Sequence, residues 1–203
     1  MDGDVMMNFT TRLARTNLYR IEWKQNSASS YQTHSAQVVW SSGAGNYLQV
    51  ESGVQPQGDQ EISLMHAAVF SDGATKNIPR LFFNLRWGGQ EATLDDSAFN
   101  ERRQADAKLG DIYCYIFTRE SQGQTNTLWI GKQDFLIHQV RTDTSAKSMR
   151  EMAARGSEPG PGLLPAMAGF TLTETHTNIV LNRKFSRADF IPSFPCFQSS
   201  DDD

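Results

Sequence analysis

The chain has little cysteine, no long apolar run and no cluster of basic residues. Its 203 residues include two cysteines, Cys114 and Cys196, which is too few for a disulfide framework. No stretch approaches the roughly 20 apolar residues that span a bilayer. The formal net charge is −4. Binding to the phosphates of a nucleic acid needs clustered cations, which this sequence lacks. These absences argue against a disulfide-stabilised miniprotein, a helical membrane protein and a nucleic-acid binder.

Motifs for catalysis and metal binding are also scarce. The sequence contains no Gly-rich phosphate loop and no nucleophile elbow. His34, His66, His138 and His176 lie too far apart along the chain to form a local zinc site. One catalytic alternative pairs Cys114 as a thiol with His138 as its base across neighbouring strands. Because Cys114 lies in an apolar run, where a thiol is usually inert, we expect no enzyme and no cofactor.

The composition is that of a globular domain, with 38% hydrophobic and 21% charged residues. We expect one domain over residues 1–198 and a frayed polar tail over residues 199–203. Residues 1–4 read Met-Asp-Gly-Asp and lack the basic start and apolar run of a signal peptide. Two alternatives stay open here, a cytoplasmic protein or one whose targeting segment has been removed.

The spacing of apolar residues predicts one helix followed by a β-rich domain. Apolar residues recur at helical spacing from Val5 to Leu13, which predicts a helix over residues 4–17. Residues 18–23 alternate between apolar and polar side chains, which indicates a strand. Further strands are expected over residues 31–41, 46–52, 61–70, 99–107, 112–119, 126–130, 135–140 and 170–181. A loop is expected over residues 53–59, and short helices over residues 78–86 and 145–155.

The expected strand over residues 112–117 is the most informative, because neither of its faces is polar. One face would carry Ile112, Cys114 and Ile116, and the other Tyr113, Tyr115 and Phe117. Such a strand must be covered on both sides or must line a cavity on one. The next strand continues the pattern through Trp129. The residues therefore favour either a filled core or an apolar ligand cavity.

The residues of such a cavity can be named. Aromatic side chains on the C-terminal strands would form its wall, and the apolar helix near Pro79 would form a movable cover. The wall residues are Tyr113, Tyr115, Phe117, Trp129 and Phe135, and the cover residues are Leu81, Phe82 and Phe83. Arg20, Arg103 and Arg141 are candidates for contact with an anionic head group.

Several segments, taken in order, resemble a known family. They are Phe9 and Leu13 with 19–23, the turn at 70–73, the strand at 111–117 followed by 127–140, and the closing segments 178–182 and 189–192. Their order and spacing, over most of the chain, resemble the LolA/LolB-like superfamily of bacterial lipoprotein carriers and their relatives. Residues 45–51 have neither the Arg nor the Pro of the corresponding stretch in the carriers, and residues 70–87 look more like the uncharacterised relatives than like the carriers.

The resemblance implies an α+β fold, in which a curved antiparallel sheet of roughly eleven strands forms an open half-barrel covered by a few helices. It also implies a cavity for a lipid or acyl chain, and a periplasmic or otherwise extracytoplasmic location. The implied partners are a lipid or an acylated protein, with peripheral contact to a membrane. Two alternatives remain. One is an envelope sensory or protein-interaction domain, like RseB-like regulators, with contacts over residues 145–169, and the other is a thiol enzyme using Cys114.

Overall fold

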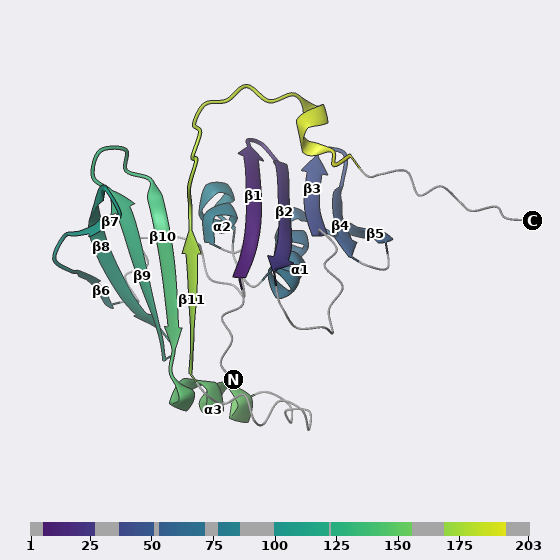
Figure 1. Ribbon diagram of the computed structural model, residues 1–203. Helices are drawn as coiled ribbons and strands as arrows, with labels where there is room; N and C mark the ends of the chain where they lie inside the picture. Colours follow the sequence, from purple (N-terminus) through teal and green to yellow (C-terminus); the bar gives the residue numbers. More distant parts are fainter. Residues whose placement is uncertain are drawn as a thin grey trace, which may run out of the picture. The chain divides into compact units, whose positions relative to one another are not determined.

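The structure is a computed structural model of the chain. It describes residues 6–26, 37–50, 53–71, 77–85, 100–121, 123–155 and 169–193. These residues form two antiparallel sheets with a few helices (Figure 1), which confirms the α+β class. Neither sheet closes into a barrel. The expected tail over residues 199–203 lies outside the described residues.

The chain divides into two compact units. The first contains residues 1–94 and 182–203, and the second contains residues 95–181. The second unit is therefore inserted into the sequence of the first. The expected single domain over residues 1–198 stays a prediction.

The first unit is built on a five-stranded antiparallel sheet in the order β1-β2-β3-β4-β5. Its strands are β1 (Met6–Ala14), β2 (Leu18–Asn26), β3 (Gln37–Ser42), β4 (Asn46–Val50) and β5 (Gly53–Gln57). Its helices are α1 (Gln60–Phe70) and α2 (Asn77–Phe83). Each strand pairs with its neighbour in the sequence, as short connections favour.

The predicted helix over residues 4–17 is wrong, because this segment forms strand β1. Its residues pair one to one with β2, from Met6 opposite Asn26 to Ala14 opposite Leu18. Met7, Phe9 and Leu13 pack against the core. Their odd-numbered positions fit the alternation of a strand, and pairing with β2 overrides the helical spacing.

The predicted strand over residues 61–70 is also wrong, because this segment forms helix α1. The Asp59 carboxylate caps the helix by accepting a hydrogen bond from the Ile62 backbone N–H at 2.8 Å. Leu64 and Ala67, one turn apart, are fully buried in the core. The expected loop over residues 53–59 is mostly strand β5. Helix α2 confirms the helix that was expected near Pro79.

The core of the first unit is centred on strand β2. The buried residues of this cluster are Tyr19, Ile21, Trp23, Val39, Leu48, Leu64, Ala67 and Leu85. The Tyr19 hydroxyl donates a hydrogen bond to Asn46 Oδ1 at 2.9 Å, and Trp23 Nε1 donates to the Phe70 carbonyl at 3.0 Å. The polar ends of both rings are therefore satisfied, and the Trp23 bond ties β2 to the end of α1.

Burial raises the pKa of the Tyr19 phenol above its ordinary value of 10.0. The folded state therefore retains the phenol proton at pH values where the unfolded chain loses it. The contribution of Tyr19 to stability is fully present below about pH 10 and is lost as the pH rises further.

Tyr19→Phe removes the titrating group and one hydrogen bond. We expect it to lower the free energy of unfolding by about 1 kcal/mol at pH 8. At pH 11 the loss should shrink by about 1 kcal/mol. Urea unfolding of both proteins at the two pH values measures this, and an equal loss at both would contradict it.

The end of the described chain returns to the first unit. Residues 182–193 include the short 3₁₀ helix η2 (Arg187–Phe190), which contacts strands β2 and β3. The Asp189 carboxylate accepts hydrogen bonds from the Ser186 backbone N–H at 2.7 Å and from the Ser186 hydroxyl at 2.8 Å. The Phe190 side chain is fully buried. This C-terminal segment, residues 182–193, is thus anchored by one aromatic ring on a short, capped turn.

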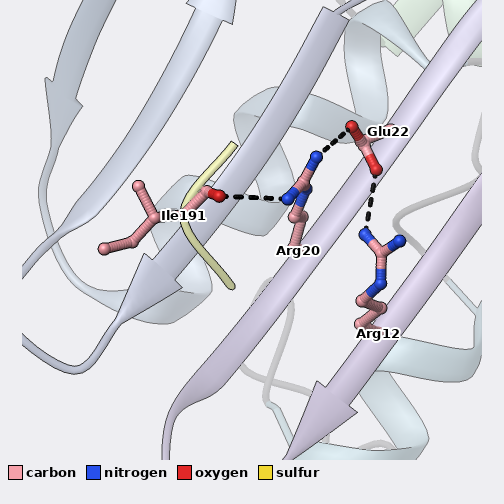
Figure 2. Close-up of polar contacts among 4 residues, drawn as sticks. All are labelled: Arg12, Arg20, Glu22 and Ile191. Atoms are coloured by element: carbon pink, nitrogen blue, oxygen red, sulfur yellow. Dashed lines mark hydrogen bonds and ion pairs between the residues drawn. The ribbon is translucent and has the colours of Figure 1, made fainter. Parts of the chain in front are cut away.

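An arginine–glutamate network also fastens the C-terminal segment (Figure 2). One end of the Arg20 guanidinium, Nη1, donates to the Ile191 carbonyl at 3.0 Å, and Nη2 contacts Glu22 Oε1 at 2.7 Å. Glu22 Oε2 accepts from Arg12 Nη1 at 3.0 Å. Arg12 and Arg20 are direct cross-strand neighbours, so the Glu22 carboxylate between them offsets their repulsion. Arg20 was expected to contact a head group, and its guanidinium instead binds Glu22 and the Ile191 carbonyl within the first unit.

The second unit is an antiparallel sheet in the order β11-β10-β9-β8-β6, with β7 also paired to β8. Its strands are β6 (Asn100–Arg103), β7 (Ala107–Leu109), β8 (Ile112–Ser121), β9 (Gln124–Gly131), β10 (Ile137–Thr144) and β11 (Phe170–Thr175). Helix α3 (Ala146–Arg155) follows β10. These elements confirm the strands expected over residues 112–119 and 126–130 and the helix expected over residues 145–155, whereas β11 ends before the expected residue 181.

Candidate ligand-binding surface

The register of β8 and β9 decides which aromatic side chains share a face. Trp129 lies opposite Ile116, whereas Tyr115 lies opposite Ile130. Directly opposed residues of an antiparallel pair have their side chains on the same face. Trp129 is therefore on the Ile116 face, away from Tyr115. The five expected wall residues all belong to the second unit, but they do not form one surface.

The two faces of strand β8 differ in burial. Cys114 and Ile116 are buried on one face. On the other, Tyr113 is 57% exposed, and Tyr115 and Phe117 are half-buried. The predicted separation of the two apolar sets is confirmed. The aromatic set reaches solvent mainly at Tyr113, whereas in the other apolar set only Ile112, at the start of the strand, is exposed, at 38%.

Phe135 presents its ring to water from a constrained backbone. Its φ of 57° lies in the left-handed region, which is uncommon for a bulky residue. The side chain is 71% exposed, and its ring stacks on Tyr115 with centroids 6.5 Å apart. The turn is held because the Phe135 N–H donates to the Gly131 carbonyl at 2.9 Å and the Leu136 N–H donates to Asp134 Oδ1 at 3.0 Å. Phe135 was expected on a strand, and it lies instead in this turn between β9 and β10.

Cationic side chains lie over the exposed rings. Arg103 Cζ is 5.3 Å and Lys132 Nζ is 5.1 Å from the Tyr115 ring centroid, and Lys108 Nζ is 4.6 Å from that of Tyr113. These distances are within the range of cation–π attraction. We call this set the Tyr115 surface. It consists of Arg103, Asp106, Lys108, Tyr113, Tyr115, Lys132 and Phe135.

Asp106 joins two of these cations. Its carboxylate accepts hydrogen bonds from Arg103 Nη2 at 2.9 Å and from Lys132 Nζ at 2.5 Å. The hydrogen bonds from Lys132 and Arg103 hold the pKa of the Asp106 carboxyl below its usual value. Arg103 was a candidate from the sequence, whereas Asp106, Lys108 and Lys132 were not. Lys132 and Asp106 are 26 positions apart, and no spacing motif indicates that they meet.

The expected cover residues belong to the first unit. Leu81, Phe82 and Phe83 lie on helix α2. Phe83 packs against the core and meets the Tyr19 ring edge to face at 6.0 Å, and the Phe82 ring lies 4.9 Å from it. Arg15 Cζ lies 5.7 Å from the Phe82 ring centroid. Phe82 and Phe83 therefore have partners in their own unit, and the role of the three residues as a cover stays a prediction.

Cys114 is a buried, free thiol. Burial raises its pKa, and the nearby Asp134 carboxylate raises it further, so the thiol is protonated at neutral pH. Its opposite residue, Gly131, has no room for a Cβ atom, which would lie 2.8 Å from His138 Nε2. His138 Nε2 contacts Asp134 Oδ2 at 2.9 Å. Cys114 and His138 do not lie on neighbouring strands as predicted, because β9 separates β8 from β10, and a buried protonated thiol is a poor nucleophile. Cys196 lies outside the described residues.

A pocket of about 270 Å³, lined mainly by short polar residues, lies beside the strand ends next to helix α3. Its lining is Gly123, Thr125, Asp143, Thr144, Ser145, Gly169, Phe170 and Thr171. Asp143 is engaged by Arg141 at 2.8 Å and by the Thr171 hydroxyl at 2.7 Å. This lining differs from the apolar wall that an acyl chain needs. Arg141, another expected head-group contact, is paired within this site. Most of the expected contact segment over residues 145–169 beyond α3 lies outside the described residues.

Within the described part of the chain, no group of three or more His, Cys, Asp or Glu side chains could hold a metal ion. No helix among the described elements is long and apolar enough to cross a membrane. Comparisons of the chain with protein-family models, with curated proteins and with solved structures found no match.

Proposed function

We propose that the chain is a non-catalytic, extracytoplasmic binding protein whose ligand carries a lipid or acyl chain, and that this ligand binds on the Tyr115 surface. The observation that carries the proposal is the conformation of Phe135. A left-handed backbone costs a bulky residue stability, and an exposed phenyl ring contributes little to folding. Residues that combine strain with exposure cluster at ligand contacts.

The chemistry of the surface fits an acyl chain. Tyr113 and Phe135 are exposed and Tyr115 is half-buried beside them, and contact with such rings removes methylene groups from water. Each buried CH₂ contributes about 0.8 kcal/mol, so contact over several carbons is enough for measurable binding.

The resemblance to the LolA/LolB-like superfamily supports the same proposal. In that family an open half-barrel holds acyl chains, and two open antiparallel sheets with a few helices are compatible with such an architecture. The half-barrel, the extracytoplasmic location and a role in handling envelope lipids or lipoproteins are therefore parts of the proposal. A lipid or an acylated protein is the proposed partner.

The proposal predicts opposite effects of Phe135→Gly on binding and on stability. We expect the affinity for a fluorescent fatty acid to fall about tenfold, because one ring of the contact is lost. The free energy of unfolding should stay the same or rise, because glycine adopts positive φ without strain. Titration of the probe and urea unfolding measure the two effects.

The matched control is Phe170→Ala, which removes another exposed phenyl ring of the second unit. It should leave the affinity for the fatty acid unchanged. Equal losses in the two variants, or no binding of the probe by the unmodified chain at micromolar concentration, would refute the proposal. Native mass spectrometry of gently purified protein gives an independent readout of bound lipid.

A further inference from the structure

The Tyr115 surface is positively charged, unlike the chain as a whole. It carries the cations Arg103, Lys108 and Lys132 and the single carboxylate of Asp106, whereas the chain has a formal charge of −4. The neighbouring Asp134 carboxylate is engaged by His138 and by the Leu136 N–H. A cationic excess beside exposed rings favours a ligand that has both an apolar and a negatively charged part.

Asp106 marks where a ligand anion can bind. Its carboxylate lies between Arg103 Nη2 and Lys132 Nζ, and both cations are close to the Tyr115 ring. The Asp106 side chain is 32% exposed, and that of Arg103 is 58% exposed. Exposed ion pairs of this kind contribute little to folding stability. A carboxylate or phosphate from outside can therefore replace Asp106 between the same donors at little cost.

We infer that the ligand of the Tyr115 surface is an anionic single-chain amphiphile. Its carboxylate or phosphate takes the place of Asp106 between Arg103 and Lys132, and its chain lies along Tyr115 and Phe135. This inference rests on the proposed function and adds the charge of the ligand to it. The guanidinium of Arg103 and the ammonium of Lys132 supply charge-assisted donors to the head group. The rings supply contact to the first carbons of the chain.

Two probes that share one acyl chain test the charge of the ligand. We expect a fatty acid to bind the unmodified chain about tenfold more tightly than its methyl ester, because only the acid carries a charge. The preference should weaken as the salt concentration rises, because exposed charges are screened. A lysophosphatidic acid of the same chain length distinguishes a phosphate head group from a carboxylate.

Three variants test the head-group site. Lys132→Gln should weaken binding of the acid about tenfold and leave the ester unchanged. Asp106→Asn should strengthen binding of the acid several-fold, because it removes the competing carboxylate without removing the donors. Lys147→Gln is the matched control, because Lys147 is an exposed lysine of helix α3 in the same unit, and it should change neither affinity.

The outcomes separate this inference from the proposed function. Equal affinity for acid and ester, with no effect of Lys132→Gln or Asp106→Asn, would overturn the anionic head group and leave acyl-chain binding in place. Binding of neither probe would overturn the proposed function and the inference with it. Displacement of the acid by millimolar inorganic phosphate alone would show a bare anion site and would also overturn the amphiphile.

Discussion

Replacing Phe190 with alanine is expected to lower the free energy of unfolding by about 3–5 kcal/mol and to release the C-terminal segment. The Phe190 ring is fully buried, and Phe185 meets it edge to face with centroids 5.3 Å apart. Residues 182–193 are also held by the buried Pro192 and by the Arg20 hydrogen bond to the Ile191 carbonyl, so the loss of this ring removes their largest apolar anchor. Urea unfolding gives the stability, and limited proteolysis reports the release of the segment.

Ile191→Ala is the matched control for this prediction. Ile191 is the next residue, its side chain is 51% exposed, and its backbone carbonyl still accepts the Arg20 hydrogen bond in the variant. We expect a change within about 0.5 kcal/mol. Similar destabilisation by both substitutions, or no new cleavage in Phe190→Ala, would show that Phe190 does not anchor the segment.

Leu64→Ala should lower the free energy of unfolding by about 2–5 kcal/mol, while Met65→Ala should change it by less than about 0.5 kcal/mol. Leu64 is fully buried in the core of the first unit, whereas Met65, the next residue of helix α1, is 41% exposed. Both changes replace a larger apolar residue with alanine, which favours the helix. The difference between them therefore reports burial alone.

Periodicity around Leu64 can be tested further with Ala67→Ser, which places a hydroxyl one turn along the same buried face. It should destabilise the chain, since an unpaired buried hydroxyl costs about 1–3 kcal/mol. If segment 61–70 were a strand, Leu64 and Ala67 would point to opposite faces, and only one of them would be sensitive. Sensitivity at both positions, measured by urea unfolding, supports the helix.

The N-terminal half of the fold was the harder half to predict. Segment 61–70 is apolar at seven of its ten residues, so its pattern alone does not separate a buried strand from a helix. The Asp59 cap was the available signal, since Asp followed by an apolar run is typical of a helix start. For β1, the odd positions Phe9 and Leu13 satisfy both a period of two and a period of four. Only pairing with β2, a tertiary effect, decides between them.

The C-terminal half was predicted more successfully because its strands are joined by short turns. Hairpins depend on local sequence, and the alternation around Cys114 was strong enough to separate its two faces correctly. The face of Trp129 depends on the register between β8 and β9, which no local pattern fixes. The left-handed turn at Phe135 and the contact between Asp106 and Lys132 depend on how loops approach each other. In the anion-binding half of the candidate site, the sequence therefore indicated Arg103 but neither Asp106 nor Lys132.

The position of the Phe190 anchor affects the order in which the chain can fold during its synthesis. All five strands of the first sheet leave the ribosome before the second unit, whereas the ring that completes this unit follows residues 95–181. At common rates of translation the interval is on the order of ten seconds. Strand β3, which η2 contacts, carries the apolar side chains of Val38 and Trp40. During this interval both side chains lack η2 as a packing partner. The nascent first unit is therefore expected to be a client of ribosome-associated chaperones until residue 190 emerges.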